Sequence, residues 1–283
     1  VESRAGMALV AELLARLHKD DGQTGKAWAF FKRARNQHGK LHDEPSVGQA
    51  TRDMEQVKTL DSDRSGRSNR LKNAVLARRI KARLDIAEAR QTIGYRDEAR
   101  DMLCECLAMA RDDDFKNLGP FILTDLGAAL TDIGMAEEGG DVLSVAAGTA
   151  KARGRGPYVL AQIAAKQGKA ALQSDQVKEA NVHYARATGL YRDARRPELA
   201  GTMLMEIARI HAASECYDLA DRAANGALIL FLEAGEIDRA VMTYGEMADF
   251  ARTDDRLFDA LAYTNKATAL EHVAFPPPKP DGP

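Results

Sequence analysis

The stretch GYRDEARDMLCECLAMA, residues 94–110, decides the fold expected for this chain. Ala99 opens the helical part of this stretch, and Cys106 follows seven residues later, so both small side chains share one helix face. Twelve residues before Ala99 lies a further small residue, Ala87. Two antiparallel helices whose axes approach to about 8–10 Å need small side chains where they cross. The spacing therefore predicts a helical hairpin with these three residues at its crossing.

The same triplet of small residues recurs along the chain. Residues equivalent to Ala99 follow one another at intervals of 40, 41, 40 and 40. Hairpin by hairpin, the triplets are Ala87, Ala99 and Cys106; Gly127, Gly139 and Ala146; Gly168, Ala180 and Ala187; Ala208, Ala220 and Ala227; and Ala248, Ala260 and Ala267. A sixth, less regular copy is Ala15, Ala27 and Ala34. We predict an all-α fold, an α-solenoid of stacked antiparallel helical hairpins with a period of about 40 residues.

Other residues agree with this register. We expect the larger residues four after the repeat position to fill the layer between neighbouring hairpins: Leu103, Leu143 and Tyr184, with Phe31 in the first copy. Turn signals precede the second helices: Gly94, Gly134, Ser174-Asp175 and Asp254-Asp255. Prolines fall where first helices should begin, at Pro120, Pro157 and Pro197. Many of the 49 alanines among 283 residues thus lie at the expected helix crossings.

This pattern resembles the tetratricopeptide repeat. The stretches GYRDEARDMLCECLAMA (94–110) and TGKAWAFFKRARN (24–36) are similar to the second helix of that repeat. The resemblance covers residues 9–39 and 74–273, although the usual period is about 34 residues. It implies an architecture of stacked hairpins and carries little information on function.

We expect four segments along the chain. Residues 1–60 form a hairpin followed by a helix over 46–60, and the polar stretch 61–70 is a linker. Residues 71–273 hold five repeats, and 274–283 form a proline-rich tail. Because the chain begins with Val1 inside a predicted helix, we expect a fragment of a longer protein or a processed chain.

The N-terminal segment carries a second resemblance. Residues 26–57 are similar to the closing part of the bacterial transcriptional activation domain, through Ala27–Arg35, Glu44-Pro45-Ser46, Thr51-Arg52 and Met54. In antibiotic-regulatory activators this domain follows a winged-helix DNA-binding domain. The resemblance implies a regulator whose DNA contact, if any, lies in a missing upstream domain.

The charge balance excludes a wholly basic surface for nucleic acid or anionic membrane. Lys and Arg number 40 against 42 Asp and Glu, a formal net charge of -2. One local run is basic, with eight cations and no acid: Arg64, Arg67, Arg70, Lys72, Arg78, Arg79, Lys81 and Arg83. It is either a site for an acidic partner or a solvated linker that leads into a basic helix face.

The three cysteines, Cys104, Cys106 and Cys216, have no metal-binding spacing. We predict reduced thiols that serve as small core residues, and a cytoplasmic protein. The longest apolar run is far shorter than the roughly 18 residues of a membrane span, so no membrane contact is expected. The sequence contains neither a phosphate-binding glycine motif nor HExxH. We therefore expect no enzyme, no cofactor and no metal site.

In a solenoid of hairpins the first helices line the concave face. The first-helix positions turned away from the crossings are the expected partner-binding groove: Glu88, Gln91, Thr131, Lys169, Leu172, Met205, Arg209 and Arg252. Lys169 and Arg209 should lie side by side and bind a carboxylate or acidic segment, with Met205 and Leu172 as apolar contacts. Alternatively they are solvated charges, paired with Glu88 or Asp249.

Two functions remain open from the sequence. The first is a non-catalytic module that binds a protein or peptide segment, which can be acidic, within a bacterial regulatory or signalling protein. The alternative is a ligand- or peptide-sensing domain of a transcriptional regulator. Mixed polar and apolar groove positions favour the first.

Overall fold

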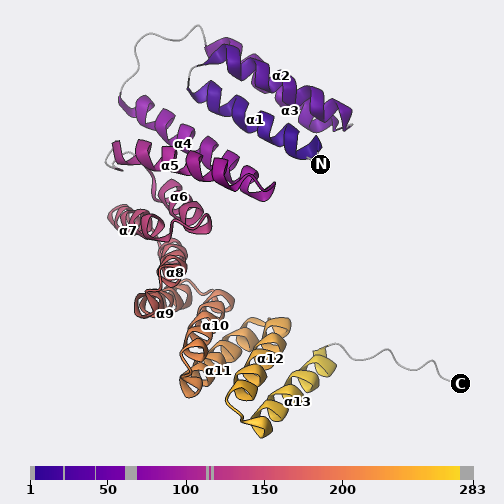
Figure 1. The fold of residues 1–283 in the computed structure, drawn as a ribbon, viewed down its shortest axis with the longest axis vertical. Helices are drawn as coiled ribbons and strands as arrows, with labels where there is room; N and C mark the ends of the chain where they lie inside the picture. The colour runs from indigo at the N-terminus through magenta and orange to yellow at the C-terminus, as the bar shows by residue number, and fades with distance from the viewer. Residues whose placement is uncertain are drawn as a thin grey trace, which may run out of the picture. The chain divides into compact units, whose positions relative to one another are not determined.

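A computed structural model describes residues 4–21, 23–41, 43–60, 69–112, 115 and 118–274 (Figure 1). These residues form thirteen α-helices and no strand, which confirms the predicted all-α hairpin fold. The helices are α1 (Arg4–Asp20), α2 (Thr24–Lys40), α3 (Glu44–Leu60), α4 (Asn69–Thr92), α5 (Arg96–Asp112), α6 (Pro120–Asp132), α7 (Ala136–Ala152), α8 (Pro157–Gln173), α9 (Val177–Asp193), α10 (Pro197–Ala213), α11 (Tyr217–Ala234), α12 (Ile237–Thr253) and α13 (Leu257–Ala274).

The chain divides into two compact units, residues 1–149 and 150–283, and the division falls within α7. Most of the expected linker, residues 61–68, and most of the expected tail, residues 275–283, lie outside the described residues. In the second unit each helix from α8 to α13 packs against the next one along the chain. The first unit follows a different order, given below.

Small residues lie at the helix crossings, as the period predicts. Gly127 of α6 and Gly139 of α7 approach so closely that a Cβ on Gly139 would lie 2.7 Å from the carbonyl oxygen of Gly127. The equivalent alanines of the other hairpins are almost fully buried, among them Ala99, Ala180 and Ala220. The close approach of two backbones therefore defines the hairpin.

The large residues four positions later fill part of the same crossing. A Cβ on Gly127 would meet the side chain of Leu143, and one on Gly168 would meet the ring of Tyr184. Tyr184 also packs with Ile210 of the following hairpin. Tyr184 thus reaches the layer between hairpins, as expected, and Leu143 and Tyr184 in addition cover the glycine of their own hairpin.

Each turn that joins two helices of the second unit contains a residue with a left-handed backbone. These residues recur every 20 positions, at Asp175, Arg195, Glu215, Gly235 and Asp255. The amide that follows each one reaches back to a helix carbonyl, as from Gln176 N to Ala171 O at 2.8 Å. This bond closes the helix in a Schellman motif. The 40-residue period is thus two helix-and-turn units of equal length.

The prolines begin first helices, as predicted. Pro120, Pro157 and Pro197 are the first residues of α6, α8 and α10. The first helical turn has no intrahelical acceptor for its amides, so the missing N–H of proline costs nothing there. Proline therefore fixes where these three helices start.

The N-terminal helices explain why residues 40–70 break the period. Among the described residues, α4 packs against α1, while α3, which precedes α4 in the chain, packs against α2. In Figure 1, α1 lies between α2 and α4. Leu13 and Leu17 of α1 share a core cluster with Ala82 and Ile86 of α4. The first unit thus joins helices that are far apart in the chain.

The crossing at Gly139 supplies a test with a matched control on the same helix. Gly139→Ala should lower the free energy of unfolding by about 1–3 kcal/mol, because its methyl group meets the α6 backbone. Gly148→Ala should raise it by about 0.5–1 kcal/mol, because Gly148 has open space around its Cα and alanine favours helix. Urea denaturation followed by circular dichroism measures both. Equal effects of the two substitutions would show that α6 and α7 do not cross at Gly139.

Candidate binding site

Arg209, at the centre of the predicted groove, is already bound to carboxylates of the second unit. Its Nε and Nη2 donate to the two carboxylate oxygens of Glu246 on α12, at 2.9 and 2.7 Å. Its Nη1 donates to Glu206, one turn away on α10, at 2.6 Å. The hydrogen bond to Glu246 raises the pKa of Arg209 above its usual range. A partner carboxylate would have to compete with these two acids.

Two of the predicted groove residues are buried. Thr131 is 2% exposed and donates its hydroxyl hydrogen bond to the Gly127 carbonyl, one turn earlier in α6. Met205 is 3% exposed and lies in the core cluster between α10, α11 and α12. The prediction that Thr131 and Met205 have accessible side chains was wrong, because both side chains point toward a neighbouring helix.

The other predicted positions are accessible, and several have partners. Lys169 and Glu88 are exposed, and Leu172 is 36% exposed. Arg252 pairs with Asp249 on its own helix α12. Gln91 of α4 donates to the carbonyl of Asp132 at the end of α6 at 3.4 Å. Glu88, Gln91 and Thr131 belong to the first unit and the other five to the second.

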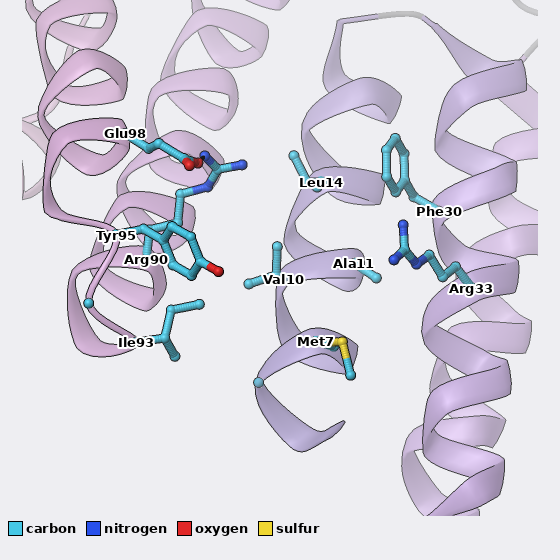
Figure 2. Close-up of a pocket in the computed structure, with 12 residues that line it drawn as sticks. Met7, Val10, Ala11, Leu14, Phe30, Arg33, Arg90, Ile93, Tyr95 and Glu98 are labelled. Carbon is cyan, nitrogen blue, oxygen red and sulfur yellow. Dashed lines mark hydrogen bonds and ion pairs between the residues drawn. The ribbon is translucent and has the colours of Figure 1, made fainter. Parts of the chain in front are cut away.

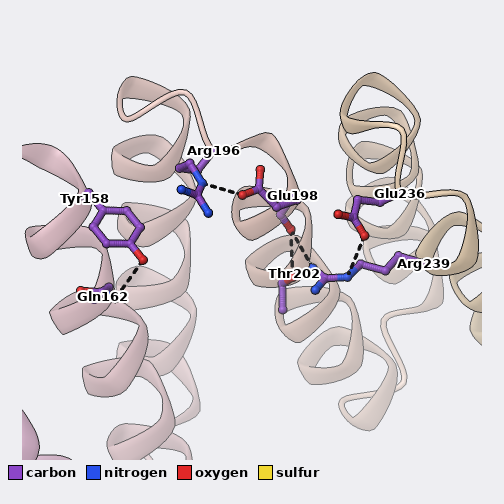
Figure 3. A network of polar contacts seen from close by, with 7 residues as sticks. All are labelled: Tyr158, Gln162, Arg196, Glu198, Thr202, Glu236 and Arg239. Carbon is purple, nitrogen blue, oxygen red and sulfur yellow. Dashed lines mark hydrogen bonds and ion pairs between the residues drawn. The ribbon is translucent and has the colours of Figure 1, made fainter.

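A polar network connects the first turns of α8 and α10 (Figure 3). The Arg196 guanidinium lies over the Tyr158 ring, 5.6 Å from its centre, and its Nε donates to Glu198 at 2.6 Å. The Tyr158 hydroxyl accepts a hydrogen bond from Gln162 at 3.2 Å. Arg196 thereby joins the first helices of two successive hairpins.

Arg239 continues this network from α12 to α10 (Figure 3). Its Nη1 donates to the Glu198 carbonyl at 3.3 Å and to the Thr202 hydroxyl at 3.1 Å. Its Nε lies 3.6 Å from the carboxylate of Glu236. The arginines of this face thus hold hairpins together.

Three described cations of the basic run, Arg79, Lys81 and Arg83, are also paired within the chain. Arg79 and Arg83 of α4 both pair with Asp21, which follows the last residue of α1. Lys81 reaches Asp125 of α6 at 3.2 Å. Arg64 and Arg67 lie outside the described residues. These contacts support the interpretation of the described cations as part of a helix face, and they fix α4 to its neighbours.

An open cleft lies in the first unit, at residues that the sequence did not single out (Figure 2). Its volume is about 670 Å³. The floor is α1, one wall is α2, and the other wall is the end of α4 with the turn into α5. The apolar lining residues are Met7, Val10, Ala11, Leu14, Phe30 and Ile93. The only hint in the sequence is the pair of apolar residues that flank Gly94, Ile93 and Tyr95, which the structure leaves 43% and 40% exposed.

The two walls of this cleft differ in charge. On the α4–α5 wall Arg90 forms an ion pair with Glu98 (Figure 2). On the α2 wall Arg33 is exposed and points from α2 toward α1. Arg33 makes no hydrogen bond or ion pair with any residue that the structure describes. The cleft therefore combines an apolar floor with one positive charge that no described residue compensates.

Within the described residues, no group of three or more His, Cys, Asp or Glu side chains could hold a metal ion. No helix among them is long and apolar enough to cross a membrane.

Comparisons place the fold. No family model matches the chain, and no curated protein matches it. Aspartyl phosphate phosphatase F from Bacillus subtilis is similar over 97% of this chain and 76% of its own, with a TM-score of 0.61 and 13% identity. The kinesin light chain TPR-like repeats of Podosopora anserina match with a TM-score of 0.57 and 15% identity, over 70% of this chain and 98% of that one. The fold is a tetratricopeptide-like helical repeat.

A third similar structure is the signal transduction ATPase with a tetratricopeptide repeat sensor from Pyrococcus horikoshii. Its TM-score is 0.53 at 16% identity, and the match covers 90% of this chain and 40% of that one. Identities this low establish the fold and nothing of the activity. The tetratricopeptide resemblance is confirmed, whereas the activation-domain resemblance of residues 26–57 remains a prediction.

The cysteines differ from the expectation of core residues. Cys106 is buried at the crossing, but Cys104 and Cys216 are exposed. Burial raises the pKa of the Cys106 thiol to about 12, so it stays protonated at pH 8.

We expect the thiols of Cys104 and Cys216 to react with a disulfide reagent in the folded chain, and the thiol of Cys106 to react only after unfolding. Rapid reaction of all three would contradict the packing of α4 on α5.

The Asp21 contact supplies a second prediction. Asp21→Asn should lower the free energy of unfolding by about 2–3 kcal/mol, because Arg79 and Arg83 lose their shared, largely buried partner. Asp125→Asn is the control, since Asp125 is half exposed and pairs with Lys81 alone; its effect should stay below about 1 kcal/mol. Thermal unfolding gives both values. Equal stability of the two variants would mean that Asp21 does not hold α4 on α1.

Proposed function

We propose that this chain is a non-catalytic helical-repeat module that binds a protein or peptide segment within a bacterial regulatory or signalling protein. The observation that carries the proposal is the cleft of the first unit. It exposes apolar side chains and Arg33, a cation without a partner among the described residues, whereas the cations of the second unit at α10 and α12 pair with their own chain. Exposed apolar surface of this kind marks interaction sites.

The similar structures support a regulatory setting. One belongs to a signalling ATPase in which the tetratricopeptide repeat is named a sensor. The proposal for this chain is the coarser property, recognition of a partner by stacked hairpins. A cytoplasmic location is part of the proposal and is supported by the three free thiols.

The second candidate is a ligand- or peptide-sensing domain of a transcriptional regulator. The cleft volume of about 670 Å³ lies within the range of about 300–1,000 Å³ found for small-molecule sites, which favours this candidate. The resemblance of residues 26–57 to an activation domain also supports it. DNA contact would then belong to a domain upstream of residue 1.

The predicted groove remains a second proposed surface. Lys169, Leu172, Arg209 and Arg252 are accessible on the first helices of the second unit. A ligand carboxylate there would exchange with Glu246 and Glu206 on Arg209. Glu88 and Gln91 remain proposed contacts in the first unit.

Selection of random peptides by phage display on the full chain tests the function. We expect peptides with a common sequence pattern, and calorimetry should give micromolar dissociation constants for them. A parallel thermal-shift screen with small metabolites separates the second candidate, which predicts stabilisation by a metabolite and no enriched peptide. Failure of both screens would refute recognition of either class.

The double variant Lys169→Glu with Arg209→Glu tells the two surfaces apart. Loss of binding by the selected peptides would assign them to the groove of the second unit, because both positive charges are reversed there. Unchanged binding would exclude that groove and leave the cleft of the first unit. Helicity measured by circular dichroism should be unchanged in the variant.

A further inference from the structure

We infer that the cleft of the first unit binds an amphipathic helix of a partner protein, with an acidic side chain of that helix paired to Arg33. This inference rests on the proposed function and names the chemistry of its partner. It follows from the shape of the floor, the character of the lining and the distribution of charge.

The floor has the spacing of a helix-binding stripe. Met7, Val10, Ala11 and Leu14 lie at positions i, i+3, i+4 and i+7 of α1 and line the cleft together. Such a stripe covers two turns, or about 10 Å along the axis. A second helix laid along α1 meets it with its own i, i+3, i+4 and i+7 residues, which is the helix-in-groove mode of recognition.

The lining favours an apolar side chain in contact with α1. Phe30 closes one side, and Ile93 lies on the other side, 43% exposed to solvent. Removing such surface from water contributes roughly 25 cal/mol per Å². Met7 is unbranched and flexible, so it adapts to side chains of different shape. The walls are open and partly exposed to solvent. Such a cleft suits a protein segment better than a fatty acid, which binds in an enclosed cavity.

The charge of the lining specifies one acidic group. On the α4–α5 wall the charge of Arg90 is balanced by Glu98. On the α2 wall Arg33 has no partner among the described residues. A bound helix would shield Arg33 from water, and a shielded cation is stable only when paired. A guanidinium binds a carboxylate through two hydrogen bonds, so aspartate or glutamate on the α2-facing flank completes the site.

Arg33 differs in this respect from Arg209 and Arg196 of the second unit. Arg209 already holds Glu246 and Glu206, and Arg196 holds Glu198. Those guanidiniums have carboxylates supplied by their own chain. At Arg33 the corresponding carboxylate must come from outside the described residues, and the adjacent apolar floor gives it a specific place.

A charge exchange tests the pairing directly. The probe is a displayed library of 14-residue helix-forming peptides with apolar residues at i, i+3, i+4 and i+7 and with Glu, Gln or Lys at one flanking position. Selection on the full chain of residues 1–283 should enrich Glu at least tenfold over Lys. Selection on Arg33→Glu should reverse that preference to Lys, because the cation of the cleft has become an anion.

Two further variants serve as controls. Lys32→Glu changes an equal charge on the same helix at a residue that does not line the cleft, so the preference for Glu should persist. Ile93→Lys places a charge in the exposed apolar wall and should remove enrichment altogether. Arg33 and Lys32 are both exposed, and circular dichroism checks that each variant folds.

The results separate this inference from the broader function. An unchanged preference for Glu on Arg33→Glu, or no enrichment of the library on the wild-type chain, overturns the assignment to this cleft. If random peptides still bind and Lys169→Glu with Arg209→Glu removes their binding, the function stands and the site is wrong. If a short fatty acid displaces the selected helix and binds with equal dependence on Arg33, the partner class is wrong.

Discussion

The whole structure depends on the close approach of two helix backbones inside each hairpin. At Gly127 and Gly139 the two chains come so near that no side chain fits between them, and buried alanines have the same role in the other hairpins. Larger residues such as Leu143 and Tyr184 then cover the crossing. Since each helix and its turn together take 20 residues in the second unit, the crossings there recur every two helices. Small residues at the crossings and a few larger residues over them therefore bury the apolar surface of this chain, and few aromatic residues are needed.

Charge supports this apolar framework from outside. Arg256 illustrates the principle: it binds Asp221 of α11 at 2.8 Å, Asp254 of the preceding turn at 2.6 Å and Asp259 of α13 at 3.2 Å. Such networks orient successive hairpins more than they add stability, because exposed ion pairs contribute little free energy individually. Arg33 stands outside these networks: it lines the apolar cleft and makes no ion pair with a residue that the structure describes.

Sequence reasoning predicted what repeats along the chain. The period, the small residues at the crossings and the proline starts are local signals, and the structure confirms them. The direction in which a single side chain points was harder to predict. Met205 and Thr131 point into the core because the neighbouring helices, and not the period, determine which side chains are covered. Arg209 finds Glu246 across 37 residues, a pairing without a local signal. The cleft could not be predicted from the sequence, because it depends on the packing of α1 against α4 and no residue spacing indicates that packing.

That arrangement of α1 and α4 has a consequence for how the protein reaches its folded state. Hairpins of the second unit join sequence neighbours, so they can assemble in the order of synthesis. The Asp21 contacts with Arg79 and Arg83 close a loop of some sixty residues, and loop closure costs entropy before any contact compensates it. The packing of α1 on α4 must therefore wait until α4 leaves the ribosome, whereas α1, α2 and α3 pack with their sequence neighbours. Both walls of the cleft exist together only after this late step.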